Sequence, residues 1–369
     1  MLKLTNWTPK SIKQELLKHV VGQDDAVSAY SVVIYNTLLR KGLANKNVKV
    51  DLAKSILLVA GDTGTGKTYL AQKAEELFGI NVILVDGSRI NGHGWAGTKI
   101  EDHLVKLENK ILKKLKLEDR LHISEDENAR EFVTELYNTI IFIDEFDKLF
   151  VSHDTHNKDA TQSAQASLLK FLEGDTYKAN KFNFDTSAFS FILSGVFEDA
   201  ISEGEKTNSI GFTEQERDKL TTNLKERLSK VGVGREILGR ITRVTKTNKL
   251  TQADLAAILE RVGSPISHYK NVFTLNDATL TLNPTVINKV AETAFKSNLG
   301  ARALKEEVDK LFEPLLFDID SYDGQWVHVT DVVDEKLATR VGDGIYSEVS
   351  REDDELNDDK DLLNLLKAH

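Results

Sequence analysis

The sequence predicts an α/β protein in which a parallel sheet with helices on both faces is followed by a small, mainly helical domain. Short apolar runs bounded by Gly, Asp or Asn recur in the first part of the chain. Such runs are typical of strands buried on both faces of a parallel sheet. Helix-like stretches lie between them, and strands that alternate with helices indicate a doubly wound α/β domain. After residue 246 the apolar residues follow a helical spacing instead.

The predicted strands of the sheet are its apolar runs: SILLVAG (55–61), NVILVDG (81–87), TIIFIDE (139–145) and SFILSG (190–195). Helical patterns between them cover residues 68–78 and 100–117. Residues 11–21 and 24–43 predict helices that precede the first strand. We therefore expect one large domain over residues 1–246.

The second domain is expected over residues 247–345. Its helical patterns cover residues 250–260, 284–297 and 301–319, and WVHVTDVV (326–333) predicts a single strand. The remaining stretch, 346–369, contains REDDELNDDKD and is acidic and poor in apolar residues. This composition is typical of a solvated tail.

Composition narrows the function classes. The 369 residues include no cysteine, which excludes disulfides and thiolate metal sites and fits a reducing compartment. No apolar run reaches the roughly 18 residues of a membrane span, and the first residues lack a secretory pattern, so we expect a cytoplasmic protein with no membrane partner. The net charge of −10 argues against nucleic acid as the main partner, because phosphate binding needs a basic surface.

GDTGTGKT (61–68) matches the P-loop pattern between a predicted strand and a predicted helix. Its glycines let backbone N–H groups converge on phosphates, and the helix N-terminus favours negative charge. Lys67 can reach the β- and γ-phosphates, and the hydroxyl of Thr68 can bind Mg²⁺. The alternative is a chance glycine turn, which the flanking elements make improbable.

IIFIDEFDK (140–148) predicts a strand that ends in paired carboxylates. Asp144 suits the Mg²⁺ shell, directly or through water. Glu145 can orient and deprotonate an attacking water. Together with the P-loop, this pair indicates ATP hydrolysis with Mg²⁺, whereas alone it could be a strand that ends in a polar turn.

In their order and spacing, these motifs and several others resemble the AAA+ ATPases, and among them the ClpX/HslU unfoldase family, with ClpX the most similar. The resemblance covers residues 12–335 and is carried by HVVGQDDAVSAYSVVIYN (19–36), GDTGTGKT (61–68), GWAG (94–97), IDEFDK (143–148), SLLKFLEG (167–174), SIGF (209–212), EILGRI (236–241) and LGARALKEEV (299–308). It implies an AAA+ large domain, a hexameric ring of identical subunits, ATP and Mg²⁺ as cofactors, and unfolding of protein substrates threaded through a central pore.

The resemblance also implies roles for single residues. Arg240 would be an arginine finger that reaches the ATP of the neighbouring subunit, and Arg302 would contact the phosphates of its own subunit's ATP. Ser194 would be the first sensor. The expected nucleotide-binding residues are Val20 and Val21 at the adenine, and Asp62, Thr63, Gly64, Thr65, Gly66, Lys67, Thr68, Tyr69, Ser194 and Arg302. The expected catalytic residues are Lys67, Asp144, Glu145 and Arg240, with Thr68 and Asp144 at the metal. The plain alternative for Arg240 is a surface arginine in one salt bridge.

Trp95, Ala96 and Gly97 lie where the family carries its aromatic pore loop. The resemblance implies that Trp95 grips the substrate in the pore, and the alternative is that it folds back onto its own domain. A second pore loop would fall within residues 151–163, whose His and Asp residues lack the spacing of a helical metal site.

Ile210, Gly211 and Phe212 lie where ClpX carries the loop that docks on the ClpP peptidase, so a ClpP-like peptidase is an expected partner. The alternative is that Phe212 packs on its own domain. The chain lacks the cysteine-ligated zinc domain of ClpX. Rival functions are a protease-independent remodeller of protein complexes, a DNA-directed AAA+ motor, and a nucleotide-dependent scaffold without hydrolysis.

Overall fold

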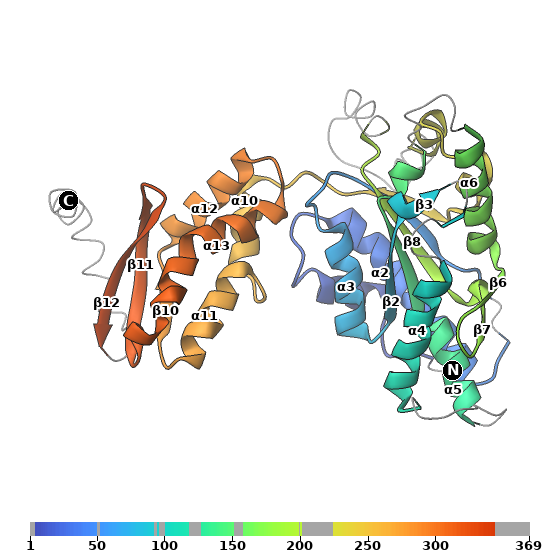
Figure 1. The fold of residues 1–369 in the computed structure, drawn as a ribbon, viewed down its shortest axis with the longest axis horizontal. Helices are drawn as coiled ribbons and strands as arrows, with labels where there is room; N and C mark the ends of the chain where they lie inside the picture. The colour runs from blue at the N-terminus through green and yellow to red at the C-terminus, as the bar shows by residue number, and fades with distance from the viewer. Residues whose placement is uncertain are drawn as a thin grey trace. The chain divides into compact units, whose positions relative to one another are not determined.

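A computed structural model describes residues 4–49, 52–91, 94–95, 100–117, 127–150, 158–198, 200 and 224–343. The chain divides between Lys249 and Leu250 into two compact units (Figure 1). No helix in these described ranges is both long and apolar enough to cross a membrane.

The first unit is built on a five-stranded parallel sheet. Its strands, in spatial order, are β2 (Asn81–Asp86), β5 (Thr139–Asp144), β8 (Ser190–Gly195), β1 (Ile56–Ala60) and β9 (Arg243–Lys246). The apolar runs predicted four of them, but not β9, a short edge strand with charged residues at both ends. The chain leaves β1 toward β2 and leaves β8 toward β9. The carboxyl ends of β1 and β8 therefore flank a topological switch point, where ligands bind in open α/β sheets.

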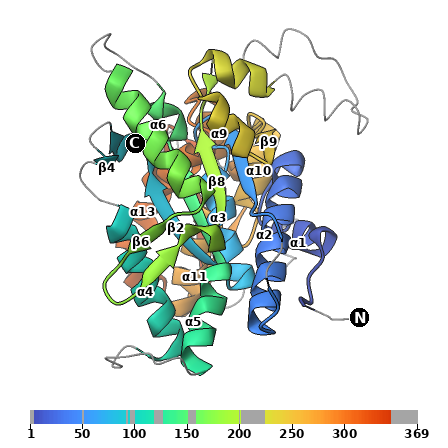
Figure 2. The same ribbon diagram turned by 90° about the vertical axis from the view of Figure 1, so that its right-hand side faces the viewer.

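Helices cover both faces of this sheet because successive residues of each buried strand point to opposite sides. Leu57 and Val59 pack with α1 (Pro9–Leu16), α2 (Asp24–Asn45) and α3 (Lys67–Phe78). On the other face, Leu58 packs with α4 (Ile100–Leu115), α5 (Glu127–Tyr137), α6 (Lys158–Glu173) and α9 (Arg235–Arg240). Figure 2 shows α1 and α2 on one side of the sheet and α4 and α6 on the other. The predicted α/β class is confirmed.

Two short hairpins and several single turns of 3-10 helix complete the first unit. One hairpin joins β3 (Ile90–Asn91) to β4 (Gly94–Trp95), and the other joins β6 (Thr176–Lys178) to β7 (Asn183–Asp185). The 3-10 turns are η1 (Gly87–Arg89), η2 (Phe146–Leu149) and η4 (Thr186–Ala188). Residues 224–230 are also helical and precede α9.

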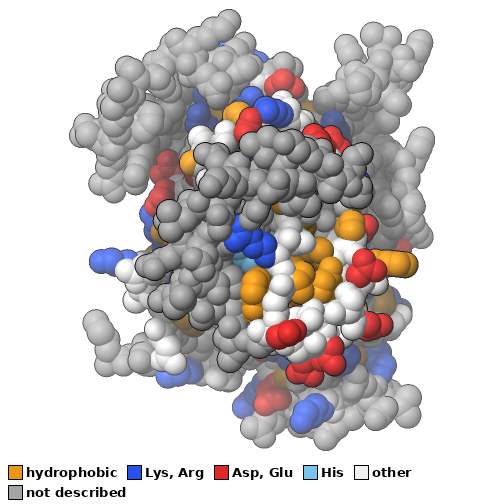
Figure 3. Space-filling view, turned by 90° about the vertical axis from the view of Figure 1, so that its left-hand side faces the viewer, with side chains coloured by type: hydrophobic (Ala, Val, Ile, Leu, Met, Phe, Trp, Pro, Cys, Tyr) orange, Lys and Arg blue, Asp and Glu red, His pale blue; other side chains and the backbone are white. Residues whose placement is uncertain are grey.

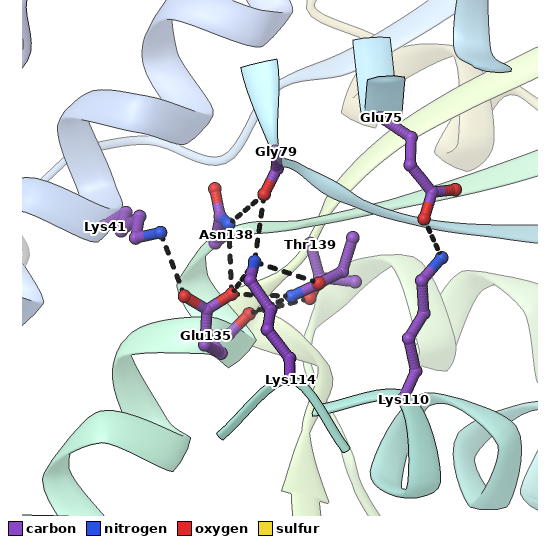
Figure 4. Close-up of polar contacts among 9 residues, drawn as sticks. Lys41, Glu75, Gly79, Lys110, Lys114, Glu135, Asn138 and Thr139 are labelled. Atoms are coloured by element: carbon purple, nitrogen blue, oxygen red, sulfur yellow. Dashed lines mark hydrogen bonds and ion pairs between the residues drawn. The ribbon is translucent and has the colours of Figure 1, made fainter. Parts of the chain in front are cut away.

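A buried carboxylate joins three helices at the amino ends of β2 and β5 (Figure 4). Glu135 of α5 forms ion pairs with Lys41 of α2 at 2.9 Å and with Lys114 of α4 at 2.6 Å. Asn81 and Asn138 also donate to the Glu135 carboxylate, at 3.0 and 3.1 Å. Burial alone would raise the pKa of Glu135, but the lysines and Asn138 outweigh it and lower the pKa to about 2.

The second unit contains α10 (Gln252–Leu259), α11 (Pro265–Leu275), α12 (Pro284–Lys296) and α13 (Ala301–Phe317), with a 3-10 turn η5 (Ile319–Tyr322) after them. Local sequence sets the helix starts. Thr251 and Asp254 form a capping box before α10, Ser264 caps α11, and Pro265 and Pro284 occupy first-turn positions.

The sheet of the second unit is larger than the sequence suggested. Beside the expected strand, β11 (Gln325–Val333), lie β10 (Thr279–Leu282), which is parallel to it, and β12 (Lys336–Asp343), which is antiparallel. The single-strand prediction was wrong because both additional strands are edge strands with alternating polar residues and no apolar run. The prediction also missed α11.

Leu275 and Phe317 are among the exposed apolar side chains of this unit, and Figure 3 shows hydrophobic side chains gathered on one of its faces.

Candidate nucleotide site

The P-loop leaves the carboxyl end of β1 and leads directly into α3. Gly66, the residue before the helix, has φ = 92°, a left-handed conformation that favours glycine. At Gly61 a Cβ atom would overlap the hydroxyl of Thr247. The backbone therefore turns sharply and closely enough that glycine is required at both ends of the loop.

The Lys67 side chain crosses the loop that precedes it. Its ammonium donates to the carbonyl oxygens of Gly61 at 2.6 Å and Asp62 at 2.7 Å, and the residue is 8% exposed. The ammonium is thus held inside the curve of the backbone, where a P-loop receives phosphate.

Asp144 joins the ends of two strands to the P-loop. Its Oδ2 accepts a hydrogen bond from the Thr68 hydroxyl at 2.8 Å. Its Oδ1 accepts from the Ser194 hydroxyl and from the Glu145 backbone N–H, each at 3.0 Å. The structure thus brings together Thr68, Asp144 and Ser194, which come from three separate stretches of the sequence.

Glu145 follows Asp144 with its side chain exposed and its backbone strained. Its φ of 51° lies in the left-handed region, which is uncommon for a residue other than glycine. Such conformations cluster at functional sites, where the surrounding structure holds them. Here the N–H bond to Asp144 and the start of η2 at Phe146 hold the backbone.

The sequence analysis missed Tyr30 of α2, which supports the loop from behind. The fully buried Tyr30 hydroxyl donates to the Lys67 carbonyl oxygen at 2.9 Å. Burial, and then the negative charge of Asp144, raise the pKa of Tyr30 well above its usual value. The hydroxyl therefore stays protonated and remains a donor. Only its place on a predicted helix was visible in the sequence.

A segment after β9 supports the loop from the side. The Thr65 and Thr247 hydroxyls lie 2.8 Å apart, and the Thr247 N–H donates to the Ala60 carbonyl at 2.8 Å. The next residue, Asn248, exchanges hydrogen bonds with the Gln23 side chain at 2.7 and 2.8 Å. Residues 20–23 are thereby connected to the P-loop through residues 247–248.

The other expected nucleotide contacts lie around this centre. Val20 is buried in the core with α1 and α2, while Val21 is half-buried. Asp62 pairs with Lys249 at 3.3 Å, and Tyr69 is 36% exposed beside the Lys73 ammonium. Thr63 is exposed and Gly64 is half-buried in the turn itself.

In the described ranges no group of three or more His, Asp or Glu side chains could hold a metal ion.

Residues 57–237 match the AAA family, described as "ATPase family associated with various cellular activities". This stretch contains the P-loop, Asp144, Glu145 and Ser194. Residues 57–237 are an AAA ATPase domain. Such a domain implies ATP hydrolysis, and members of the family bind ATP, usually with Mg²⁺.

The chain is also similar to proteins described as "ATP-dependent Clp protease ATP-binding subunit ClpX". The one from Treponema denticola is 29% identical over 348 residues, which cover 86% of this chain and 79% of the relative. For Bacteroides fragilis the identity is 29% over 347 residues, or 87% and 79% of the two chains. For Borrelia duttonii it is 29% over 340 residues, or 85% and 75%. The chain therefore contains an AAA ATPase domain and is distantly related to ClpX.

Arg240 lies near the amino ends of the sheet's strands, whereas the P-loop lies at their carboxyl ends. It ends α9, just before Thr242, whose N–H and hydroxyl donate to the carbonyl of Ile56, the first residue of β1. The P-loop begins after Ala60, the last residue of that five-residue strand. At about 3.3 Å per residue, the strand separates the two by roughly 16 Å. Arg240 instead pairs with Glu173 at 2.5 Å.

Arg302 lies in the second unit, as the second residue of α13, and is exposed. The Trp95 backbone pairs with Ile90 in the β3–β4 hairpin. Ala96 and Gly97, residues 151–157 of the expected second pore loop, and Ile210, Gly211 and Phe212 lie outside the described residues.

Proposed function

We propose that this AAA ATPase is a ring-forming protein unfoldase of the ClpX type, which hydrolyses ATP between neighbouring subunits and pulls polypeptides through a central pore. The relatives described as ClpX match 85–87% of the chain, which is well beyond residues 57–237 and too much for the match to lie within the first unit alone. That extent supports a shared machine rather than a shared nucleotide domain alone.

The residues at the P-loop fit ATP and Mg²⁺. Backbone N–H groups of the glycine turn and the N-terminus of α3 would hold the phosphates. The Lys67 ammonium would exchange its carbonyl partners for phosphate oxygens. The Thr68 hydroxyl and the Asp144 carboxylate, 2.8 Å apart, are hard oxygen ligands of the kind Mg²⁺ prefers. Bound Mg²⁺ would neutralise charge that develops on the phosphates.

Glu145 is the proposed general base. Its side chain is exposed next to Asp144, and a carboxylate so placed can take a proton from a water that attacks the terminal phosphate. Ser194, held against Asp144, would keep that carboxylate oriented and offer a polar contact to the same phosphate.

The observation that carries the ring is the position of Arg240. The arginine is exposed at the sheet edge opposite to its own P-loop, so it could complete only the site of another copy. A surface that completes a different surface of the next copy makes a heterologous contact, and such contacts form a ring when the rotation between copies closes. Arg302 of the second unit would couple the nucleotide to motion between the units.

Trp95 is the proposed grip on substrate, presented by the β3–β4 hairpin. The decisive experiment compares Glu145→Gln and Trp95→Ala with the wild type, measuring ATPase and the unfolding of a stable, tagged fluorescent protein. Glu145→Gln should bind ATP but lose hydrolysis by about 100-fold or more, because general base catalysis contributes about 10²–10⁴-fold.

Trp95→Ala should keep most of the ATPase activity and lose unfolding, whereas the control Trp95→Phe should keep both. Normal unfolding by Trp95→Ala would contradict the role of Trp95 in gripping the substrate. Normal hydrolysis by Glu145→Gln would contradict the role of Glu145 as general base.

The proposed partner is a ClpP-like peptidase, because the relatives are described as subunits of a Clp protease. Adding such a peptidase should give ATP-dependent degradation of the tagged protein, and Phe212→Ala should abolish degradation while leaving unfolding intact. Unfolding without degradation by the wild type would instead identify a protease-independent remodeller.

A further inference from the structure

The backbone on both sides of Arg240 is fixed to the first unit. The Lys225 ammonium donates to the carbonyl oxygens of Leu238 at 3.2 Å and Ile241 at 2.7 Å. Thr242 is bonded through its N–H and its hydroxyl to Ile56. Leu238 lies in the last turn of α9 and Ile241 directly follows it, and the carbonyls at a helix end ordinarily have no partner within the helix. The segment that carries Arg240 is therefore held rigidly.

The backbone of Glu173, the partner of Arg240, is held in the same way at the end of α6. The Lys170 carbonyl accepts from the Gly174 N–H at 3.1 Å, and the Phe171 carbonyl accepts from the Thr186 hydroxyl at 2.9 Å. The Leu172 carbonyl accepts from the Lys54 ammonium at 2.6 Å. Each of these carbonyls of the last helical turn has a donor, so the backbone that carries the Glu173 side chain is fixed to the core.

The ion pair itself contributes little to stability. Its side chains are 55% and 38% exposed, and solvent weakens the attraction between exposed charges. It joins one guanidinium nitrogen, Nη2, to one carboxylate oxygen, Glu173 Oε1, at 2.5 Å. A guanidinium has five N–H donors, so most of the fork is still available to a second anionic partner.

We infer that Glu173 is a positioning residue for Arg240, which holds the guanidinium in one rotamer so that its other N–H groups meet the ATP of the next subunit. The inference rests on the proposed function of Arg240. A free arginine side chain samples many rotamers, and an anchor on a rigid helix removes that freedom before the subunits meet.

The test begins with Glu173→Ala and Glu173→Gln. Glu173→Ala should lower kcat for ATP hydrolysis by the assembled ring by about 10- to 100-fold, because small misplacements of a positioned group cost that much. Glu173→Gln, which keeps a neutral acceptor, should fall between. The KM for ATP should change by less than about twofold, since the finger acts in the transition state. In the Arg240→Ala background, Glu173→Ala should have no further effect.

Glu236→Gln is the matched control, an exposed acid on α9 itself that no described contact joins to Arg240, and it should behave as the wild type. Unchanged or faster hydrolysis by Glu173→Ala would overturn the inference. Faster hydrolysis would show that Glu173 restrains the arginine instead of presenting it.

Mixed rings separate positioning from misfolding. Glu173→Ala subunits keep Lys67, Asp144 and Glu145, while Glu145→Gln subunits keep the intact Arg240–Glu173 pair. Each is slow alone, but mixing should raise the ATPase rate per Glu173→Ala subunit several-fold, because its site then receives a correctly held arginine. A misfolded variant would show no rise, and that result would overturn the inference.

The same mixture made with Arg240→Ala tests the proposed function separately. If Arg240→Ala is not rescued by Glu145→Gln subunits, the arginine does not act between subunits and the proposed function fails. If Arg240→Ala is rescued but Glu173→Ala hydrolyses ATP normally, only the positioning inference fails.

Discussion

At the scale of single residues, Asp144 and Tyr30 organise the nucleotide site by different means. Asp144 accepts hydrogen bonds from Thr68, Ser194 and the Glu145 backbone, so it fixes these groups relative to one another beside the P-loop. The Tyr30 hydroxyl donates to the Lys67 carbonyl from within the core. The Asp144 contacts therefore position side chains of the site, whereas the Tyr30 contact positions the backbone at the end of the P-loop.

Tyr30→Phe should destabilise the first unit and weaken ATP binding. Removing the hydroxyl deletes one hydrogen bond to the Lys67 carbonyl, and such a bond contributes about 0.5–1.5 kcal/mol to stability. Urea unfolding measures the stability, and titration with a fluorescent ATP analogue measures the affinity. Tyr35→Phe is the control on the same helix, because no described hydrogen bond involves the Tyr35 hydroxyl. Equal effects of the two substitutions would contradict the role given to Tyr30.

At the scale of elements, α2 runs from the carboxyl ends of the strands of the ATPase sheet to their amino ends. Its first half carries Tyr30, which contacts the P-loop at the carboxyl edge. Its second half carries Arg40, which donates to the Ala188 and Ser187 carbonyls, and Lys41, which pairs with Glu135 at the amino edge. The helix has 22 residues and is therefore about 33 Å long, which suffices to reach both edges.

The Glu135 cluster at the end of α2 should make stability depend on acid pH. The pKa of Glu135 in the folded chain, about 2, lies below its ordinary value of 4.5. A lowered carboxyl pKa stabilises the fold fully above the unfolded pKa, and that contribution is lost as the pH falls from 4.5 toward 2. We expect the wild type to lose about 2 kcal/mol more than Glu135→Gln across this window.

Urea unfolding at several pH values between 6 and 2.5 measures this difference. The control is Glu76→Gln, because Glu76 pairs with Lys73 on the exposed surface of α3, where solvent screens the interaction. Glu76→Gln should follow the wild-type pH dependence. A Glu135→Gln protein with the same pH dependence would show that the cluster does not hold the helices as argued.

At the scale of the whole molecule, the chain consists of a unit that contains the AAA ATPase domain with its P-loop and a second unit with its own core. Arg240, the expected arginine finger, lies near the amino ends of the strands, away from the P-loop of its own chain. A single chain with this arrangement should therefore be a slow ATPase, and its activity should rise with concentration as copies assemble.

Assembly should depend on nucleotide. Glu145→Gln with ATP and Mg²⁺ should form a particle several times the 41.3 kDa of one chain, as light scattering coupled to gel filtration would measure. Lys67→Ala should fail to assemble under the same conditions, because it lacks a principal phosphate contact. A Glu145→Gln protein that remains at the mass of one chain would contradict the ring.

Features that depend on neighbours along the chain could be predicted from the sequence. The four apolar runs became β2, β5, β8 and β1 because strands buried on both faces of a parallel sheet are mostly apolar along their length. The P-loop could be recognised because its glycines, lysine and threonine act from consecutive positions. Edge strands such as β9, β10 and β12 escaped prediction, since half of their residues face solvent or loops and carry no apolar signal.

The sequence by itself determined the ATPase class and the local chemistry of residues 61–68 and 144–145, because that chemistry is written in adjacent side chains. Only the tertiary structure decided that Tyr30 supports Lys67, that Glu173 holds Arg240, and that Glu135 takes two lysines from different helices. Each of these contacts joins polar groups far apart in the chain. Many residues could serve as such a partner, and only folding selects which of them arrive within hydrogen-bonding distance.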